Sequence, residues 1–208
     1  MPGRLIYLMG PSGSGKDTIL QGLGRLMGQR GYIAPRLITR PRTSTERDAV
    51  SVSHAEFLQL ERSGGLAMSW RANGLAYGVR VDINDRLSAG CDVLVNGSRE
   101  YLLQARSRYR TLVPVLLTVE DETLYQRLVA RGRENQDQIR RRLDRNARYA
   151  RLADSVNAGA IMALDNSGPV EDAIQALYQY LDQTDTDTRH DHVVDTIGYG
   201  QRRTSPCL

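Results

Sequence analysis

Short apolar runs alternate with amphipathic segments along this chain. The runs at 4–9, 92–95 and 112–119 have the length and composition typical of buried parallel strands, and a weaker run lies at 160–164. Apolar side chains at three- and four-residue spacing predict helices from Asp17 onward and over 53–62, 101–109, 120–131, 135–149 and 170–181. Strands that alternate with helices predict an α/β fold with a parallel sheet and right-handed crossovers.

Two segments depart from this alternation. Residues 39–81 are rich in arginine, serine and glycine and contain the only tryptophan, Trp70, which indicates a small inserted subdomain. Residues 127–151 are rich in arginine, a pattern that fits either a solvated helix or a functional surface. The final segment, 184–208, lacks apolar periodicity, and we predict that it is mobile.

Composition narrows the class of protein. A chain of 208 residues, with 40% hydrophobic and 25% charged residues, has the size and make-up of one globular domain. No apolar run reaches the length of a membrane span, and the apolar start passes directly into glycines, so we expect neither an anchor nor a signal peptide. Cys91 and Cys207 lie too far apart for ligand-like spacing, so we expect no disulfide framework or zinc site and a cytoplasmic location.

The basic residues point to anionic partners. The net charge is +4 and the pI is about 9.3. Lys16 is the only lysine, and it lies inside a glycine-rich loop, whereas every other basic residue is an arginine. No run of interleaved aromatic residues accompanies these arginines, so we expect no nucleic-acid partner.

That loop matches the phosphate-binding pattern G-x-x-x-x-G-K-[ST] except at its last place, where Asp17 stands. It follows a predicted strand and precedes a predicted helix, as such a loop must. Inward-facing backbone N–H groups would cradle nucleotide phosphates, and Lys16 would reach between the β- and γ-phosphates. The residues predicted to bind ATP here are Gly10, Pro11, Ser12, Gly13, Ser14, Gly15, Lys16, Asp17 and Thr18.

Asp17 leaves the position of a magnesium ion open. The usual serine or threonine holds Mg²⁺ through a neutral hydroxyl, whereas a carboxylate brings a negative charge close to the triphosphate. Asp17 binds the metal directly or through water, or Thr18 supplies the hydroxyl, or Asp17 only stabilises the start of the helix. We expect Mg²⁺ as a cofactor, with Asp17 and Thr18 as the candidate ligands.

Five segments together resemble the guanylate kinase superfamily over about residues 4–181. They are the phosphate loop, Ile38–Pro41 (ITRP), Ser69–Gly78 (SWRANGLAYG), Val95–Arg99 (VNGSR) and Arg127–Arg133 (RLVARGR). Their combination is most similar to the ribose 1,5-bisphosphate phosphokinases. The resemblance implies a three-layer P-loop kinase fold with an inserted acceptor-binding subdomain at about 39–81 and an arginine-rich lid at about 131–142. It also implies ATP-dependent formation of 5-phosphoribosyl 1-diphosphate in bacterial phosphonate breakdown.

The same resemblance suggests how the acceptor is recognised. Guanylate kinases place a guanine-reading glutamate immediately before the tryptophan, where this chain has Ser69. The phosphate-binding positions are retained, which fits a sugar phosphate. The implied substrate-binding residues are Arg40, Arg42, Arg47, Tyr77 and Asn96, with Arg71 a further candidate. Asn96 occupies a strand end where related enzymes place a magnesium-orienting aspartate, so the acid has, by hypothesis, moved to Asp17.

The resemblance assigns the remaining roles to the lid and to the end of the last strand. Arg131 and Arg142 would close over the transferring phosphoryl group, and Arg133 would contact ATP. Asn166 would border the adenine. A phosphate oxygen is already anionic, so no general base is needed, and the arginines with Lys16 neutralise the charge between the two substrates.

Two other functions remain open on the sequence. One is a guanylate kinase with an unusual base pocket, and the other is a non-catalytic guanylate-kinase-like binding module, against which the intact phosphate loop argues. We expect the kinase domain to span 1–183, with no membrane partner. The sequence does not fix the oligomeric state, and a homodimer is one arrangement that it allows.

Overall fold

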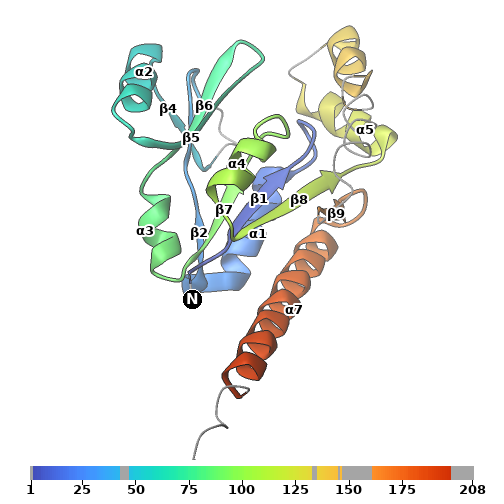
Figure 1. The fold of residues 1–208 in the computed structure, drawn as a ribbon. Helices are drawn as coiled ribbons and strands as arrows, with labels where there is room; N and C mark the ends of the chain where they lie inside the picture. Colours follow the sequence, from blue (N-terminus) through green and yellow to red (C-terminus); the bar gives the residue numbers. More distant parts are fainter. Residues whose placement is uncertain (1, 43–46, 133–134, 145, 147–160, 198–208) are drawn as a thin grey trace, which may run out of the picture.

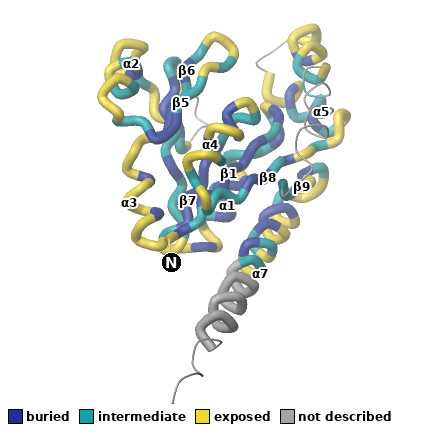
Figure 2. Tube along the Cα trace, viewed as in Figure 1, coloured by how far each residue is buried: buried dark blue, intermediate teal, exposed yellow. Residues whose placement is uncertain are grey.

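The computed structural model describes residues 2–42, 47–132, 135–144, 146 and 161–197, with side chains described as far as Thr184. Within these residues, five strands form a parallel sheet in the order β2-β7-β1-β8-β9. The bounds are β1 Leu5–Met9, β2 Gly31–Ile33, β7 Asp92–Asn96, β8 Leu112–Thr118 and β9 Met162–Asp165. Strand β1 is central and buried along its whole length, so the loop that follows it starts from the buried centre of the sheet (Figure 2).

Helices cover both faces of this sheet (Figure 1). On β1, Ile6 and Leu8 face α1 (Lys16–Met27) and α7 (Val170–Ile197), where they join a core cluster with Leu23 and Leu177. Alternate residues of β1 join the opposite cluster with side chains of α3 (Ile83–Ser88) and α4 (Leu102–Arg108). This two-sided burial explains why β1 is a continuous apolar run in the sequence.

A second, four-stranded sheet carries the inserted subdomain. Its order among the described strands is β4-β3-β6-β5, with bounds β3 Arg36–Ile38, β4 Ala49–Ser51, β5 Leu66–Ala72 and β6 Leu75–Arg80. Helix α2 (His54–Arg62) packs on it through the buried Phe57. A capping box starts α2, because Ser53 accepts from the Glu56 N–H while the Glu56 carboxylate accepts from the Ser53 N–H.

The arginine-rich segment forms a helical pair beside the phosphate loop. Helix α5 (Asp121–Arg131) and a helix over 136–144 share an apolar seam of Leu124, Leu128 and Ile139. Asn135 and Gln138 exchange side-chain and backbone hydrogen bonds of 3.0 and 2.9 Å, which fixes the start of the second helix. Figure 1 shows this pair and the inserted subdomain on either side of the ends of β1 and β8.

The structure confirms the α/β class, with a parallel sheet and an inserted subdomain, and it adds elements that periodicity did not predict. Strands β2 to β6, the short helix α3 and the 3-10 turn at Gly28–Arg30 were not anticipated. The inserted sheet starts at Arg36, three residues before the predicted subdomain. Helix α7 continues to Ile197, whereas we predicted its end at Leu181. Among the described residues, no helix has both the length and the apolar character that crossing a membrane requires.

Candidate active site

The loop between β1 and α1 has the backbone form that phosphate binding requires. Gly13 and Gly15 have φ values of +93° and +92°, in the left-handed region that favours glycine. The buried Ser14 hydroxyl donates to Pro11 O at 2.8 Å, and the Asn166 amide donates to Ser14 O at 2.7 Å. These bonds hold the loop curled around the N-terminus of α1, where N–H groups favour an anion.

Lys16 folds back over this loop. Its ammonium donates to Gly10 O at 2.9 Å and to Pro11 O at 2.7 Å. Burial, followed by the positive charges of Arg36, Arg99 and Arg131, lowers the pKa of Lys16 to about 7, against a smaller opposing effect of Asp17. The arginines around Lys16 therefore give the site an excess of positive charge, which an anionic ligand would balance.

Asp17 meets the residue with which we expected it to exchange roles. The Asn96 amide donates to Asp17 Oδ1 at 2.6 Å, from the end of β7 to the first turn of α1. The Asn96 Oδ1 atom is buried and has no hydrogen-bond partner among the described residues. A carboxylate beside an orphaned amide oxygen, with the exposed Thr18 next in the chain, is an oxygen-donor set that fits Mg²⁺ together with phosphates and water.

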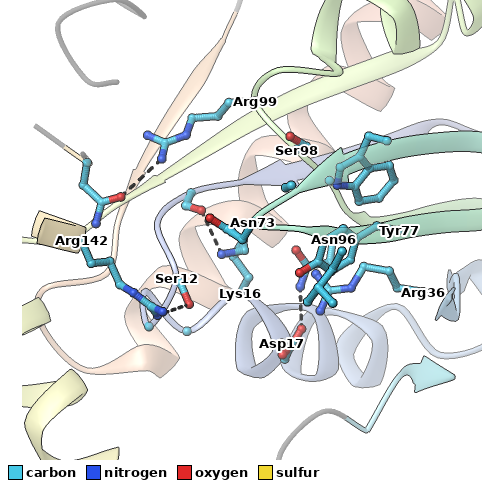
Figure 3. A pocket seen from close by; sticks show the side chains of 18 of the residues that line it. Ser12, Lys16, Asp17, Arg36, Asn73, Tyr77, Asn96, Ser98, Arg99 and Arg142 are labelled. Atoms are coloured by element: carbon cyan, nitrogen blue, oxygen red, sulfur yellow. Dashed lines mark hydrogen bonds between the residues drawn. The ribbon is translucent and has the colours of Figure 1, made fainter. Parts of the chain in front are cut away.

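A cleft of about 1030 Å³ opens over the loop. We call it the central cleft. Its walls come from the phosphate loop, β3, the β5–β6 hairpin, the turn after β7, helix α5 and the helix over 136–144 (Figure 3). Its lining includes Lys16, Arg36, Arg40, Arg71, Arg99, Arg127, Arg131 and Arg142 against Asp17 and Glu100. A cavity with this excess of cations suits two phosphorylated ligands held side by side.

Trp70 and Tyr77 line one wall of the central cleft, which we call the acceptor wall because the predicted acceptor residues Arg40 and Tyr77 line the cleft there. Trp70 on β5 and Tyr77 on β6 are cross-strand partners whose rings stack with centroids 5.7 Å apart. The ring of Tyr101, just before α4, lies tilted beside Trp70, with the two ring centroids 5.9 Å apart. The guanidinium of Arg36 lies over the Tyr77 ring, 5.5 Å from its centroid.

The predicted acceptor residues divide into two groups. Arg40 and Tyr77 line the central cleft together with Asn96, whereas Arg42 and Arg47 are exposed and do not line it. For Arg42 and Arg47 the structure therefore gives no support to a substrate-binding role.

Arg71 and Ser69 belong to the opposite face of β5. Arg71 reaches the rim of the cleft, but its guanidinium pairs with Glu61 on α2 at 2.7 Å and lies over the Phe57 ring. Arg71, and then a hydrogen bond from Ser69, lower the pKa of Glu61. Because Ser69 lies beside α2 and does not line the cleft, the missing carboxylate at this position is not what shapes the acceptor wall.

A buried tyrosine fixes the turn after β7. The Tyr7 hydroxyl accepts from Ser98 N–H and donates to Ser98 O, both at 2.9 Å. A Cβ on Gly97 would lie 2.1 Å from the Tyr7 ring, so only glycine fits there. Strand β1 thus positions the turn that carries Asn96 and Arg99 into the cleft.

The lid meets the phosphate loop directly. Arg142 donates to the Ser12 hydroxyl at 2.8 Å, and Arg99 donates to Asn146 at 3.5 Å (Figure 3). Arg131, at the end of α5, lines the cleft beside them. Arg133 lies outside the described residues. The two predicted lid arginines that the structure describes therefore both face the phosphate loop.

Asn166 lies beneath the phosphate loop. It is 2% exposed and does not line the central cleft, and its amide supports the loop from below through Ser14 O. Pro11 and Ser14 are likewise buried, so their side chains shape the loop and the loop's backbone faces the cleft. In this structure Asn166 supports the loop, and its expected contact with adenine stays a prediction.

Sequence reasoning did not single out three cleft residues, Arg36, Asn73 and Arg99. Arg36 stands in a strand of three residues, too short to show a pattern. Asn73, with φ +52°, and Gly74 form the two-residue turn of the β5–β6 hairpin, and this Asn-Gly pair was a signal that could have revealed the hairpin. Arg99 lies in the VNGSR segment, where the resemblance assigned only Asn96.

A phosphate loop at the carboxyl end of a parallel sheet, faced by an arginine lid and a separate acceptor wall, defines a P-loop kinase. A family model described as an AAA domain matches residues 6–158. Curated relatives are similar in sequence over most of the chain. Ribose 1,5-bisphosphate phosphokinase PhnN of Pseudomonas paraeruginosa is 52% identical over 87% of this chain and 96% of its own length. The corresponding protein of Pseudomonas fluorescens is 47% identical over 88% and 96%. The chain belongs to this phosphokinase family.

A solved structure agrees at the level of the fold. Guanylate kinase from Anaplasma phagocytophilum superposes with a TM-score of 0.68 at 18% identity, covering 88% of this chain and 86% of that one. An identity this low shows a common fold and does not carry the guanylate kinase activity to this protein.

Proposed function

We propose that this protein transfers the γ-phosphoryl group of ATP to ribose 1,5-bisphosphate, giving 5-phosphoribosyl 1-diphosphate and ADP. The observation that carries the proposal is the continuity of one cationic cleft from the phosphate loop to the Arg40 and Tyr77 wall, in a chain whose relatives are named as ribose 1,5-bisphosphate phosphokinases. Both substrates are multiply anionic, as this cleft requires. The activity fits a role in phosphonate breakdown in the cytoplasm.

The residues act by alignment and charge neutralisation. The loop backbone binds the ATP phosphates, and Lys16 swings from its own loop carbonyls to the β- and γ-phosphates. Arg131 and Arg142 face the same loop and would neutralise the charge that develops during transfer. An acceptor phosphate oxygen attacks in line and needs no general base, while closure of the lid excludes water.

Asp17 would hold Mg²⁺, with Asn96 orienting the carboxylate and Thr18 beside it. When bound, Mg²⁺ supplies positive charge to the phosphate oxygens. On the acceptor side, Arg40 and Tyr77 would hold the sugar phosphate from the second sheet.

The direct test is ADP production from ATP and Mg²⁺ with ribose 1,5-bisphosphate, run beside GMP, AMP and ribose 5-phosphate, with the product identified by mass. We expect turnover of the bisphosphate and little from the others. Lys16→Ala should abolish it, whereas Arg80→Ala, an exposed arginine of β6 outside the cleft, should not change it. Turnover of GMP alone would show that the protein is a guanylate kinase.

A further inference from the structure

Arg36 stands where the two halves of the central cleft meet. It pairs in register with Val79 on β6, two residues beyond Tyr77, so Arg36 and Tyr77 lie on the same face of the second sheet. Tyr77 pairs in turn with Trp70 on β5. The three side chains form a row across β3, β6 and β5, and the row lines the cleft.

The charge of Arg36 reaches the phosphate loop as well as the acceptor wall. Among the charged neighbours that lower the pKa of Lys16, Arg36 has the largest effect. Its guanidinium also lies 5.5 Å from the centroid of Tyr77, one of the predicted phosphate-binding residues. A phosphate that attacks the γ-phosphoryl group must lie between these two places, within reach of the Arg36 fork.

The position of Arg36 also decides which surfaces the acceptor can use. Its guanidinium lies over the Tyr77 ring, and Trp70 stacks beside that ring with an interplanar angle of 10°. A planar base needs an open aromatic face for stacking. With the guanidinium in place, the Tyr77 wall presents a cation where a nucleobase would need a ring.

We propose that Arg36 binds the attacking phosphate of the acceptor and, by covering Tyr77, makes the cleft selective for a sugar phosphate over a nucleotide. The inference rests on the proposed function and assigns a specificity-determining residue to it. Arg36 then complements Arg40 from the floor of the cleft, while Lys16 and the lid arginines bind ATP.

Trp70 is the only tryptophan, and it lies in the row, so its fluorescence reports acceptor binding without turnover. Ribose 1,5-bisphosphate is titrated into the wild type, Arg36→Gln, Arg36→Lys and the exposed control Arg80→Gln, and ATP binding is measured separately by calorimetry. We expect Arg36→Gln to weaken bisphosphate binding by roughly 10- to 100-fold, the value of a lost charged hydrogen-bond pair, and to leave ATP binding within about threefold. Arg36→Lys should fall between, because an ammonium keeps the charge and loses the fork.

Selectivity is read from the ratio of the dissociation constants for GMP and the bisphosphate in Arg36→Ala, relative to the wild type. Both ligands lose the phosphate contact, so a fall of this ratio by roughly tenfold, which is about 1.4 kcal/mol, isolates the effect of uncovering the Tyr77 ring. An unchanged ratio overturns the selectivity, and bisphosphate binding within about twofold of wild type in Arg36→Gln overturns the phosphate contact.

Failure of the proposed function gives a different result. A wild-type protein that neither binds nor turns over the bisphosphate contradicts that function by itself. The contact of Arg36 is then tested with inorganic phosphate in the presence of ADP, which occupies the loop. Equal phosphate binding by wild type and Arg36→Gln would overturn the inference independently.

Discussion

At the scale of single residues, Lys16 sets how ATP binding responds to pH. Burial and the nearby arginines lower its pKa to about 7, from a usual value of 10.5. Bound phosphates would reverse this, because an opposite charge favours the protonated form. At a pH between the pKa of Lys16 in the free enzyme and its higher pKa in the ATP complex, the free enzyme lacks a proton that the complex holds. ATP binding must therefore take up a proton.

We therefore predict uptake of about one proton per ATP at about pH 8, and a loss of affinity of up to about tenfold for each pH unit above 7. Below pH 7 Lys16 is already protonated in both states, and its contribution disappears. Calorimetry in two buffers of different ionisation enthalpy measures the uptake. Lys16→Arg keeps a permanent charge and should abolish it, so uptake that persists in this variant would assign the proton to another group.

The contact between Asp17 and Asn96 leads to a second prediction. If the carboxylate has replaced the usual hydroxyl as the metal ligand, Asp17→Ala should raise the Mg²⁺ concentration for half-maximal activity by roughly tenfold, because a charged ligand is lost. Thr18→Ala should have a smaller effect. Titration of Mg²⁺ and Mn²⁺ checks both, with Asp85→Ala, an exposed acid of α3, as the control. The reverse order of effects would assign the metal to Thr18.

At the scale of elements, sequence periodicity was sufficient to predict the position of a helix or strand that is long or buried on both faces. Strands β1, β7 and β8 and helices α1, α2 and α5 appear at their predicted places. The inserted sheet was missed because β3 and β4 have three residues each, too few for an alternation to show. In β5, one face packs on α2 and the other lines a cationic cleft, so polar residues occur on both faces.

The phosphate loop packs closely against helix α5 at Gly13. A Cβ at this position would lie 2.8 Å from Leu128 in the seam of α5, and its φ of +93° is unfavourable for alanine by about 1–2 kcal/mol. We predict that Gly13→Ala weakens ATP binding by at least about tenfold, while far-ultraviolet circular dichroism stays unchanged. Gly168→Ala, which meets open space at an ordinary φ, is the matched control. Equal ATP binding by the two variants would show that the loop tolerates the displacement.

At the scale of the whole molecule, residue patterns alone predicted the site only where it is contiguous in the chain. The family resemblance was needed for Arg40, Tyr77, Asn96, Arg131 and Arg142, all of which line the cleft. The residues of the loop lie next to each other in sequence, so glycine spacing and one lysine were enough to identify ATP binding. Arg36, Arg99 and Arg131 come from β3, the turn after β7 and the end of α5, and only the packing of the two sheets brings their charges to Lys16. No local pattern distinguishes these arginines from the solvated ones.

Arg4 joins segments that lie far apart in the sequence, and its contacts lead to the last prediction. Its guanidinium pairs with Asp92 at 2.6 Å, and it also donates to Leu181 O and Thr184. It thereby connects β1, β7 and α7. Asp92 is only 7% exposed, so removing the guanidinium leaves a buried carboxylate that has lost its opposite charge and keeps the Arg4 backbone N–H, at 2.7 Å from Oδ1, as a hydrogen-bond donor.

Arg4→Met should lower the free energy of unfolding by about 3–5 kcal/mol, measured by urea denaturation. The double variant Arg4→Met/Asp92→Asn should recover part of the loss, because it removes the unpaired charge. Arg86→Met, an arginine on the surface of α3, should cost less than about 1 kcal/mol. Because the pair lies at the amino ends of β1 and β7, opposite the phosphate loop, ATP affinity of the folded Arg4→Met protein should stay within about twofold of wild type. A stable variant with weakened ATP binding would instead mean that α7 transmits strain through α1 to the loop.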